Sequence, residues 1–127
     1  MSIVNLSVAI FTFFTAIVII FQLCLVIGLP LGAASMGGKF PGKYSPKMRI
    51  VALINSFLLF FILIIVASKA QFLFLELLSF SKIAIWFVVL FFGVGTIMNI
   101  ITPSKIERIW APVAAIQMIT SLIIAII

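Results

Sequence analysis

The residues best suited to bind a ligand gather in one polar segment of an otherwise apolar sequence. Residues 28–49 hold five of the seven glycines, three of the five prolines and four of the eight basic residues. Turns such as Gly37-Gly38 and Pro41-Gly42 can present backbone N–H groups without obstructing side chains, as anion-binding nests do. Ser45-Pro46 is typical of a helix start, with serine as the N-cap and proline in the first helical position. Any binding chemistry is therefore expected in this segment.

A second polar segment lies nearer the C-terminus. Residues 102–110 read Thr-Pro-Ser-Lys-Ile-Glu-Arg-Ile-Trp. Ser104 and Glu107 have the spacing of a capping box, in which each side chain binds a backbone N–H that the helix start leaves free. The alternative pairs Glu107 with Arg49 or Arg108, because a carboxylate at membrane depth needs a cation.

The two segments together predict an anion site. Arginine suits phosphate and carboxylate groups, since its planar guanidinium makes two parallel hydrogen bonds. Two helix N-termini, with free N–H groups and a partial positive charge, are expected beside the two arginines. The site would bind a lipid headgroup or an anionic solute through Gly37, Gly38, Ser45, Arg49, Ser104, Glu107 and Arg108. The alternative is that the basic residues only orient the protein and attract anionic lipid loosely.

Four amide side chains inside the apolar segments form a second candidate site: Gln22, Asn55, Asn99 and Gln117. Each is separated by roughly 3 to 10 residues from the end of its segment that adjoins residues 28–49 or 102–110, so the helical rise places all four in one layer. This intramembrane polar layer could line a path for a solute. Alternatively, the amides make hydrogen bonds between helices, which contribute about 0.6 kcal/mol each.

Catalysis and metal binding find little support in the sequence. There is no histidine, one cysteine and only two acidic residues. This leaves no ligand set for zinc or haem and no intrachain disulfide, and Cys24 is interpreted as a small apolar packing residue. Because no general base can be assembled convincingly inside a span, we expect no enzyme activity, no cofactor and no metal.

Composition predicts the fold class. The 127 residues are 66% hydrophobic and 8% charged, which is too few charges to cover a soluble domain. We expect an all-α polytopic membrane protein, a single domain of four transmembrane helices in two hairpins, with spans at about 3–29, 49–68, 83–101 and 106–127. Residues 71–82 are too short for another crossing and are interpreted as a short interfacial or hairpin helix in the middle loop.

The N-terminal apolar run has an alternative interpretation as a cleaved signal peptide. Small residues follow it at positions 32–35, as a signal peptidase requires. However, no basic residue precedes the run, which is about twice as long as the apolar core of a signal. We therefore expect a transmembrane span.

The distribution of basic residues predicts the orientation. The first and third loops hold six of the eight basic residues and the middle loop holds the other two, Lys69 and Lys82. Because positive charge accumulates on the cytoplasmic side, loops one and three are expected in the cytoplasm and both termini outside the plasma membrane.

Two motifs carry a resemblance. Pro30-x-Gly32-x-x-x-x-Gly37-Gly38 follows the first span, and Thr102-Pro103-Ser104-x-x-Glu107-Arg108-x-Trp110 precedes the last. The pattern resembles a group of small, functionally uncharacterised bacterial four-span membrane proteins, over most of the chain. The resemblance implies no known activity.

Two function classes follow from these expectations. The first is an oligomeric transporter or channel that uses the intramembrane polar layer and the predicted anion site on the cytoplasmic side. The second is an accessory or regulatory subunit whose lipid-facing surface docks a larger membrane protein. The expected partners are the lipid bilayer, anionic lipid, and either further copies of the chain or that larger protein, with no nucleic acid.

Overall fold

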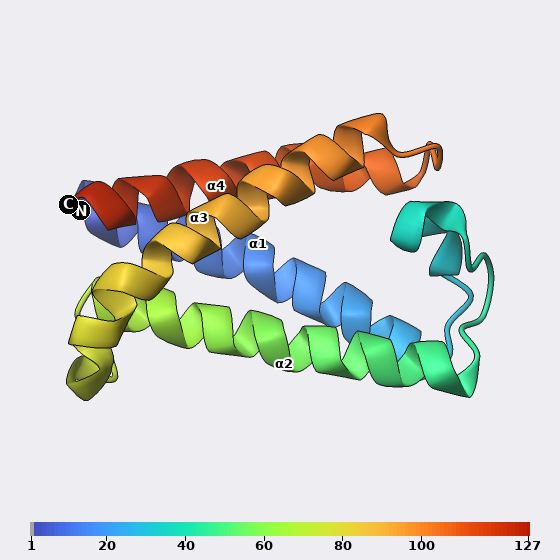
Figure 1. Ribbon diagram of the computed structural model, residues 1–127, viewed down its shortest axis with the longest axis horizontal. Helices are drawn as coiled ribbons and strands as arrows, with labels where there is room; N and C mark the ends of the chain where they lie inside the picture. The colour runs from blue at the N-terminus through green and yellow to red at the C-terminus, as the bar shows by residue number, and fades with distance from the viewer. Residues whose placement is uncertain (1) are drawn as a thin grey trace.

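A computed structural model describes residues 2–127 and contains four long helices (Figure 1). They are α1 (Ile3–Val26), α2 (Pro46–Lys69), α3 (Leu78–Ile101) and α4 (Trp110–Ile126). Four short 3-10 helices lie in the loops: η1 (Gly32–Ala34), η2 (Met36–Gly38), η3 (Leu75–Leu77) and η4 (Glu107–Ile109). All four long helices, α3 together with η3 and α4 together with η4, are long and apolar enough to cross a membrane. The prediction of an all-α protein with four transmembrane helices is confirmed.

Helix lengths agree with a bilayer as the surrounding solvent. α1, α2 and α3 have 24 residues each, and at 1.5 Å per residue each is about 36 Å long, enough for a hydrocarbon core of about 30 Å. α4 has 17 residues and follows η4 directly. Pro112 therefore falls in the first turn of α4, where a missing backbone N–H costs little.

Local chemistry sets the helix ends. α1 stops because Gly28 adopts a left-handed conformation with φ of 91°. The Leu29 N–H then donates to the Cys24 carbonyl at 3.0 Å, which is the 6→1 bond of a Schellman motif. At the start of α2, the Ser45 side chain accepts a hydrogen bond from the Met48 N–H, as the sequence predicts.

The middle loop is shorter than the sequence suggests. α3 begins at Leu78, five residues before the expected start of the third span at residue 83. Only the single turn η3 precedes it, so Ser79 and Lys82 belong to α3 and not to a separate interfacial helix. The loop closes tightly because Phe74 takes a left-handed conformation and its carbonyl accepts a hydrogen bond from Ser68 Oγ at 3.0 Å.

The helices form two antiparallel hairpins, α1–α2 and α3–α4 (Figure 1). Loop 1 (residues 27–45) and loop 3 (residues 102–109) lie at one end of the bundle. Both termini and loop 2 (residues 70–77) lie at the other end (Figure 1). α2 and α3 approach each other near loop 2 and diverge toward loops 1 and 3 (Figure 1).

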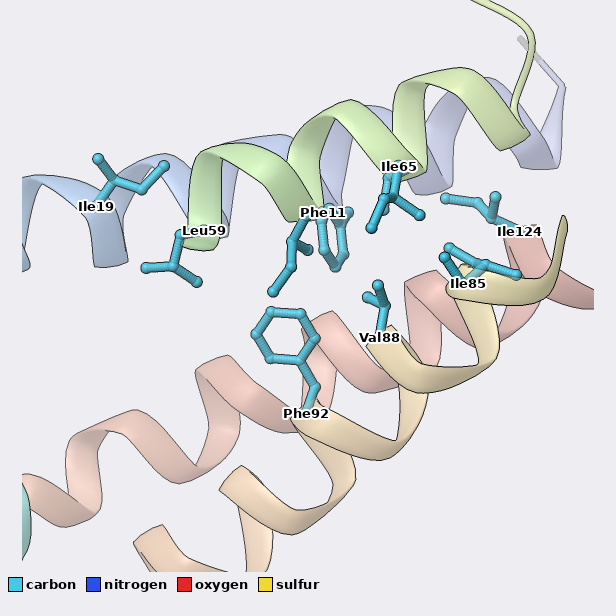
Figure 2. Packing of buried hydrophobic residues seen from close by; sticks show 11 residues of the cluster. Phe11, Ile19, Leu59, Ile65, Ile85, Val88, Phe92 and Ile124 are labelled. Atoms are coloured by element: carbon cyan, nitrogen blue, oxygen red, sulfur yellow. The ribbon is translucent and has the colours of Figure 1, made fainter. Parts of the chain in front are cut away.

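The hydrophobic core occupies the half of the bundle near loop 2. At its centre, the Phe11 and Phe92 rings meet edge to face, with centroids 5.5 Å apart and an interplanar angle of 82° (Figure 2). Ile65 of α2 and Ile124 of α4 are buried in the same cluster, so all four helices contribute to it. Most large apolar side chains elsewhere on the helices are exposed, as lipid contact requires. Leu25 is an exception, because it is buried with Tyr44 and Ala52 in a smaller cluster near loop 1.

Loop 1 folds back on itself through a glycine that has no room for a side chain. The Gly32 N–H donates to the Gly42 carbonyl at 2.9 Å. A Cβ atom at position 32 would lie 1.9 Å from the Phe40 carbonyl oxygen and 2.7 Å from that of Gly42. Both neighbours are backbone atoms, so the loop itself would have to move.

We predict that Gly32→Ala lowers the free energy of unfolding by about 2 kcal/mol or more, the range of a substitution that forces the backbone apart. Gly95→Ala on α3 is the matched control, because a Cβ there meets no atom within 4 Å. Alanine in a helix interior should raise stability by about 0.5–1 kcal/mol. Thermal unfolding in a mild detergent would compare the two variants, and equal effects would contradict this account of loop 1.

Candidate functional site

A cavity of about 280 Å³ lies between the four helices on the side of loops 1 and 3. All four side chains of the intramembrane polar layer line it: Gln22, Asn55, Asn99 and Gln117. They come from α1, α2, α3 and α4 in turn. The structure therefore gathers amides that are far apart in the sequence around one space.

The floor and cover of the cavity come from different parts of the chain. Leu59 and Phe92 belong to the hydrophobic core and also line the cavity, so the core forms its floor. Ala34 and Ser35 of loop 1 contribute to its cover. Trp110 links α4 to this cover, since its Nε1–H donates to the Ala34 carbonyl at 3.0 Å.

Aromatic rings form much of the remaining wall. The rings of Phe21 and Trp110 lie 4.8 Å apart, centroid to centroid. The Tyr44 hydroxyl is hydrogen-bonded to that of Ser35, and both side chains line the cavity. The wall thus combines π-faces, hydroxyl groups and amides.

Glu107 is the charged residue that lines the cavity, and it also ties loop 3 to loop 1. The buried carboxylate accepts hydrogen bonds from the Gly37 N–H, with both oxygens at 3.2 Å, and from the Thr102 hydroxyl. Gly37 lies 70 residues away in the sequence. We call this set of contacts the loop tie.

The predicted capping box is half formed. The Ser104 hydroxyl accepts the Glu107 N–H at 3.4 Å, as a capping box requires. The reciprocal bond is made by another residue, since the Ser104 N–H donates to Thr102 Oγ1 at 3.2 Å. The Glu107 carboxylate is therefore available for the loop tie.

Arg49 and Arg108, the arginines of the predicted anion site, each donate to a backbone carbonyl at the end of the preceding helix. Arg49 Nε donates to the Val26 carbonyl at 2.6 Å. Arg108 donates to the Thr102 carbonyl through Nε at 3.2 Å and Nη2 at 3.1 Å. A cation at a helix C-terminus is favourable, because it complements unpaired carbonyls and the negative end of the helix dipole.

The other predicted anion-site residues divide into two groups. Gly37, Gly38 and Ser104 converge with Glu107 at the contact between loops 1 and 3. There a Cβ on Gly38 would lie 3.0 Å from Ser104 Cβ, and the Ser104 hydroxyl donates to the Ala33 carbonyl. Ser45 lies apart, as the N-cap of α2. The structure thus joins four of the seven residues and gives the two arginines separate partners.

Sequence reasoning overlooked several residues of the site. Gln117 Nε2 donates to Thr15 Oγ1 at 2.9 Å, which links α4 to α1 through two buried side chains. Thr15 could have been found from its position seven residues before Gln22, which places both on one helix face. Thr102, Ser35 and Tyr44 offered no comparable signal, since the fold of each loop, and not helical spacing, brings them to their partners.

The arrangement is suited to binding a small polar molecule. Residues 2–127 contain no group of three or more cysteine, aspartate or glutamate side chains placed to hold a metal ion. Amides both donate and accept hydrogen bonds, while the carboxylate only accepts when ionised. The cavity can therefore hold a small molecule with several hydrogen-bonding groups.

Comparisons of the chain with protein family models, curated proteins and solved structures give no match.

We predict that Glu107→Ala lowers the free energy of unfolding by about 1–3 kcal/mol, because the Gly37 N–H and the Thr102 hydroxyl lose a charged acceptor. Glu76→Ala is the matched control, since Glu76 is exposed in η3 and its loss should leave stability unchanged. Thermal unfolding in mild detergent would measure the difference. Faster hydrogen exchange of the Gly37 amide in Glu107→Ala should accompany it, and unchanged exchange would show that the loop tie does not hold loop 1.

Proposed function

We propose that the protein is a small transporter of the plasma membrane that binds its solute in the interhelical cavity. The observation that carries this proposal is the gathering of an amide from each helix around one space of about 280 Å³. Polar side chains inside a membrane are costly unless they find partners. Gln117 has a hydrogen bond to Thr15, but no such bond within residues 2–127 is found for the side chains of Gln22, Asn55 or Asn99. A bound solute would supply those partners.

A carrier suits the geometry better than an open channel. The cavity ends at Leu59 and Phe92, beyond which the packed core fills the bundle. A continuous path would need this core to part, whereas a carrier exposes one site to each side in turn. The cavity lies within a single chain, so the proposed site needs no second copy.

The charges of the cavity bear on the class of solute. Among residues 2–127, Glu107 lines the cavity and no lysine or arginine does. A cationic or neutral hydrogen-bonding solute therefore fits this space better than an anion. The predicted anion site at Arg49 and Arg108 stays a separate hypothesis, in which a headgroup would have to compete with the Val26 and Thr102 carbonyls.

The alternative function, an accessory subunit of a larger membrane complex, gains no specific support. Exposed phenylalanine, isoleucine and leucine side chains cover the helices, but any lipid-facing helix needs such a surface. The cavity distinguishes the two functions, because a docking subunit has no need for a layer of amides around an internal space.

Cysteine labelling would test the transporter proposal. In a Cys24→Ala background, Gly95→Cys places a thiol in the cavity at a position where a Cβ meets nothing within 4 Å. We expect a membrane-impermeant methanethiosulfonate reagent to label it from either side, in vesicles of opposite orientation. Val94→Cys, next to it on α3 and exposed to lipid, should react slowly from both sides. Labelling of Gly95→Cys from one side only would indicate a static site and overturn the transporter.

The orientation of the protein in the membrane has a separate test. The proposed orientation places loops 1 and 3 in the cytoplasm and both termini outside. Lys43→Cys in loop 1 and Gln71→Cys in loop 2 should then label from opposite sides of intact cells, Gln71→Cys from the outside. Reversed labelling would overturn the orientation, and labelling of both from the same side would contradict the four-span arrangement.

A further inference from the structure

We infer that the ligand of the cavity is a cationic amphiphile with a single apolar chain, which enters from the lipid between α2 and α3. This inference rests on the proposed binding function of the cavity. It is carried by a second hollow, an apolar groove of about 340 Å³ between α2 and α3.

The groove continues from the cavity. Leu58 of α2 and Phe91 of α3 line both spaces. From these two residues the groove follows α2 to Ile65 and α3 back to Phe80, toward loop 2. The seven residue steps from Leu58 to Ile65 correspond to about 10 Å of helix. A polar space that opens into an apolar groove has the shape of an amphiphile, with its head in the cavity and its chain in the groove.

The direction of the groove agrees with entry from the bilayer. The cavity lies on the side of loops 1 and 3, and the groove begins near the middle of α2 and α3, at Leu58 and Phe91, and runs toward loop 2. A lipid in the leaflet on that side has the same polarity, with its head near those loops and its chain toward the bilayer centre. The amphiphile can therefore enter between α2 and α3 without turning over, with its chain reaching past the bilayer centre toward loop 2.

The charge of the head follows from Glu107. The donors to its carboxylate are neutral groups, the Gly37 N–H and the Thr102 hydroxyl, while Arg49 and Arg108 donate to carbonyls. An ionised side chain at membrane depth is favoured by a cationic partner. The rings of Phe21, Tyr44 and Trp110 also line the cavity, and aromatic faces attract ammonium groups.

The basic residues of loops 1 and 3 disfavour the entry of a cation from water but do not obstruct entry through the groove. Lys39, Lys43, Lys47 and Lys105 lie in or beside these loops, and their charge repels a cation that approaches from water. Entry through the groove passes between the apolar side chains of α2 and α3 instead. Because lipid is as apolar as the groove, moving the chain from lipid into the groove gains no hydrophobic free energy. The chain therefore contributes packing contacts and positions the head, while the head determines which amphiphile is selected.

The test uses protection of Gly95→Cys, in the Cys24→Ala background and in dodecyl maltoside, against the uncharged reagent methyl methanethiosulfonate. We expect dodecyltrimethylammonium to slow labelling about tenfold, through its charge on Glu107 and its contact with the rings. Dodecanol and laurate, with equal chains and neutral or negative heads, should slow it less than about twofold. Glu107→Gln keeps an acceptor for Gly37 but should remove the preference for the cationic head.

A pair of variants on α3 tests the groove. Ile83 lines the groove and is 68% exposed, while Leu90 is 62% exposed and faces lipid elsewhere. Ile83→Trp should weaken protection by dodecyltrimethylammonium about fivefold, because the ring fills space that the chain needs. Protection by tetramethylammonium, which has no chain, should not change. Leu90→Trp should leave both unchanged and so controls for the added ring.

The outcomes separate this inference from the proposed function. If Gly95→Cys does not react without a ligand, the cavity is closed to solutes and the proposed function fails. If it reacts but dodecyltrimethylammonium gives no protection, only the present inference fails. Equal or better protection by laurate or dodecanol overturns the cationic head. An equal effect of Ile83→Trp and Leu90→Trp overturns the role of the groove.

Discussion

The contact between Glu107 and Gly37 holds the two hairpins together at the end where their helices diverge (Figure 1). Loop 1 is rich in glycine, so it has few side chains with which to pack. Its attachment to the second hairpin therefore uses backbone groups. Glu107 supplies an acceptor for Gly37, Ser104 donates to the Ala33 carbonyl and Trp110 to that of Ala34. These polar contacts position loop 1 over the cavity.

The bundle therefore has two unlike halves. Near loop 2, the core around Phe11 and Phe92 joins all four helices by close packing (Figure 2). Near loops 1 and 3, the divergence of α2 and α3 leaves space that amides, aromatic rings and a carboxylate surround. Leu59 and Phe92 belong to both halves. The packed half gives the helices a fixed base, and the open half keeps room for a ligand.

Three basic side chains donate to carbonyls at helix C-termini and do not line the cavity. Arg49 and Arg108 bind the carbonyl ends of α1 and α3, and Lys69 Nζ donates to the Ile124 carbonyl of α4 at 3.0 Å. Each places a positive charge at the negative end of a helix dipole. With these charges engaged at the helix ends, the carboxylate of Glu107 determines the sign of the charge that lines the cavity.

The class of the protein and its four spans could be predicted from the sequence, because both depend on local composition. A long apolar run becomes a helix in lipid whatever its neighbours do, and Ser45-Pro46 starts α2 by contacts within one turn. Helical rise alone likewise placed Gln22, Asn55, Asn99 and Gln117 at similar depth, although it could not show that they face one space.

Tertiary structure alone decided the partners of the polar side chains. The sequence offered Glu107 an arginine or a capping box, whereas its carboxylate binds the Gly37 N–H, 70 residues distant, and the Thr102 hydroxyl. Thr15 and Gln117 meet across 102 residues. Any of several hydrogen-bonding partners would satisfy such groups equally well, and the crossing of the helices determines which one lies within reach. Spacing along the chain contains no information about that crossing, because it arises from packing among distant apolar faces.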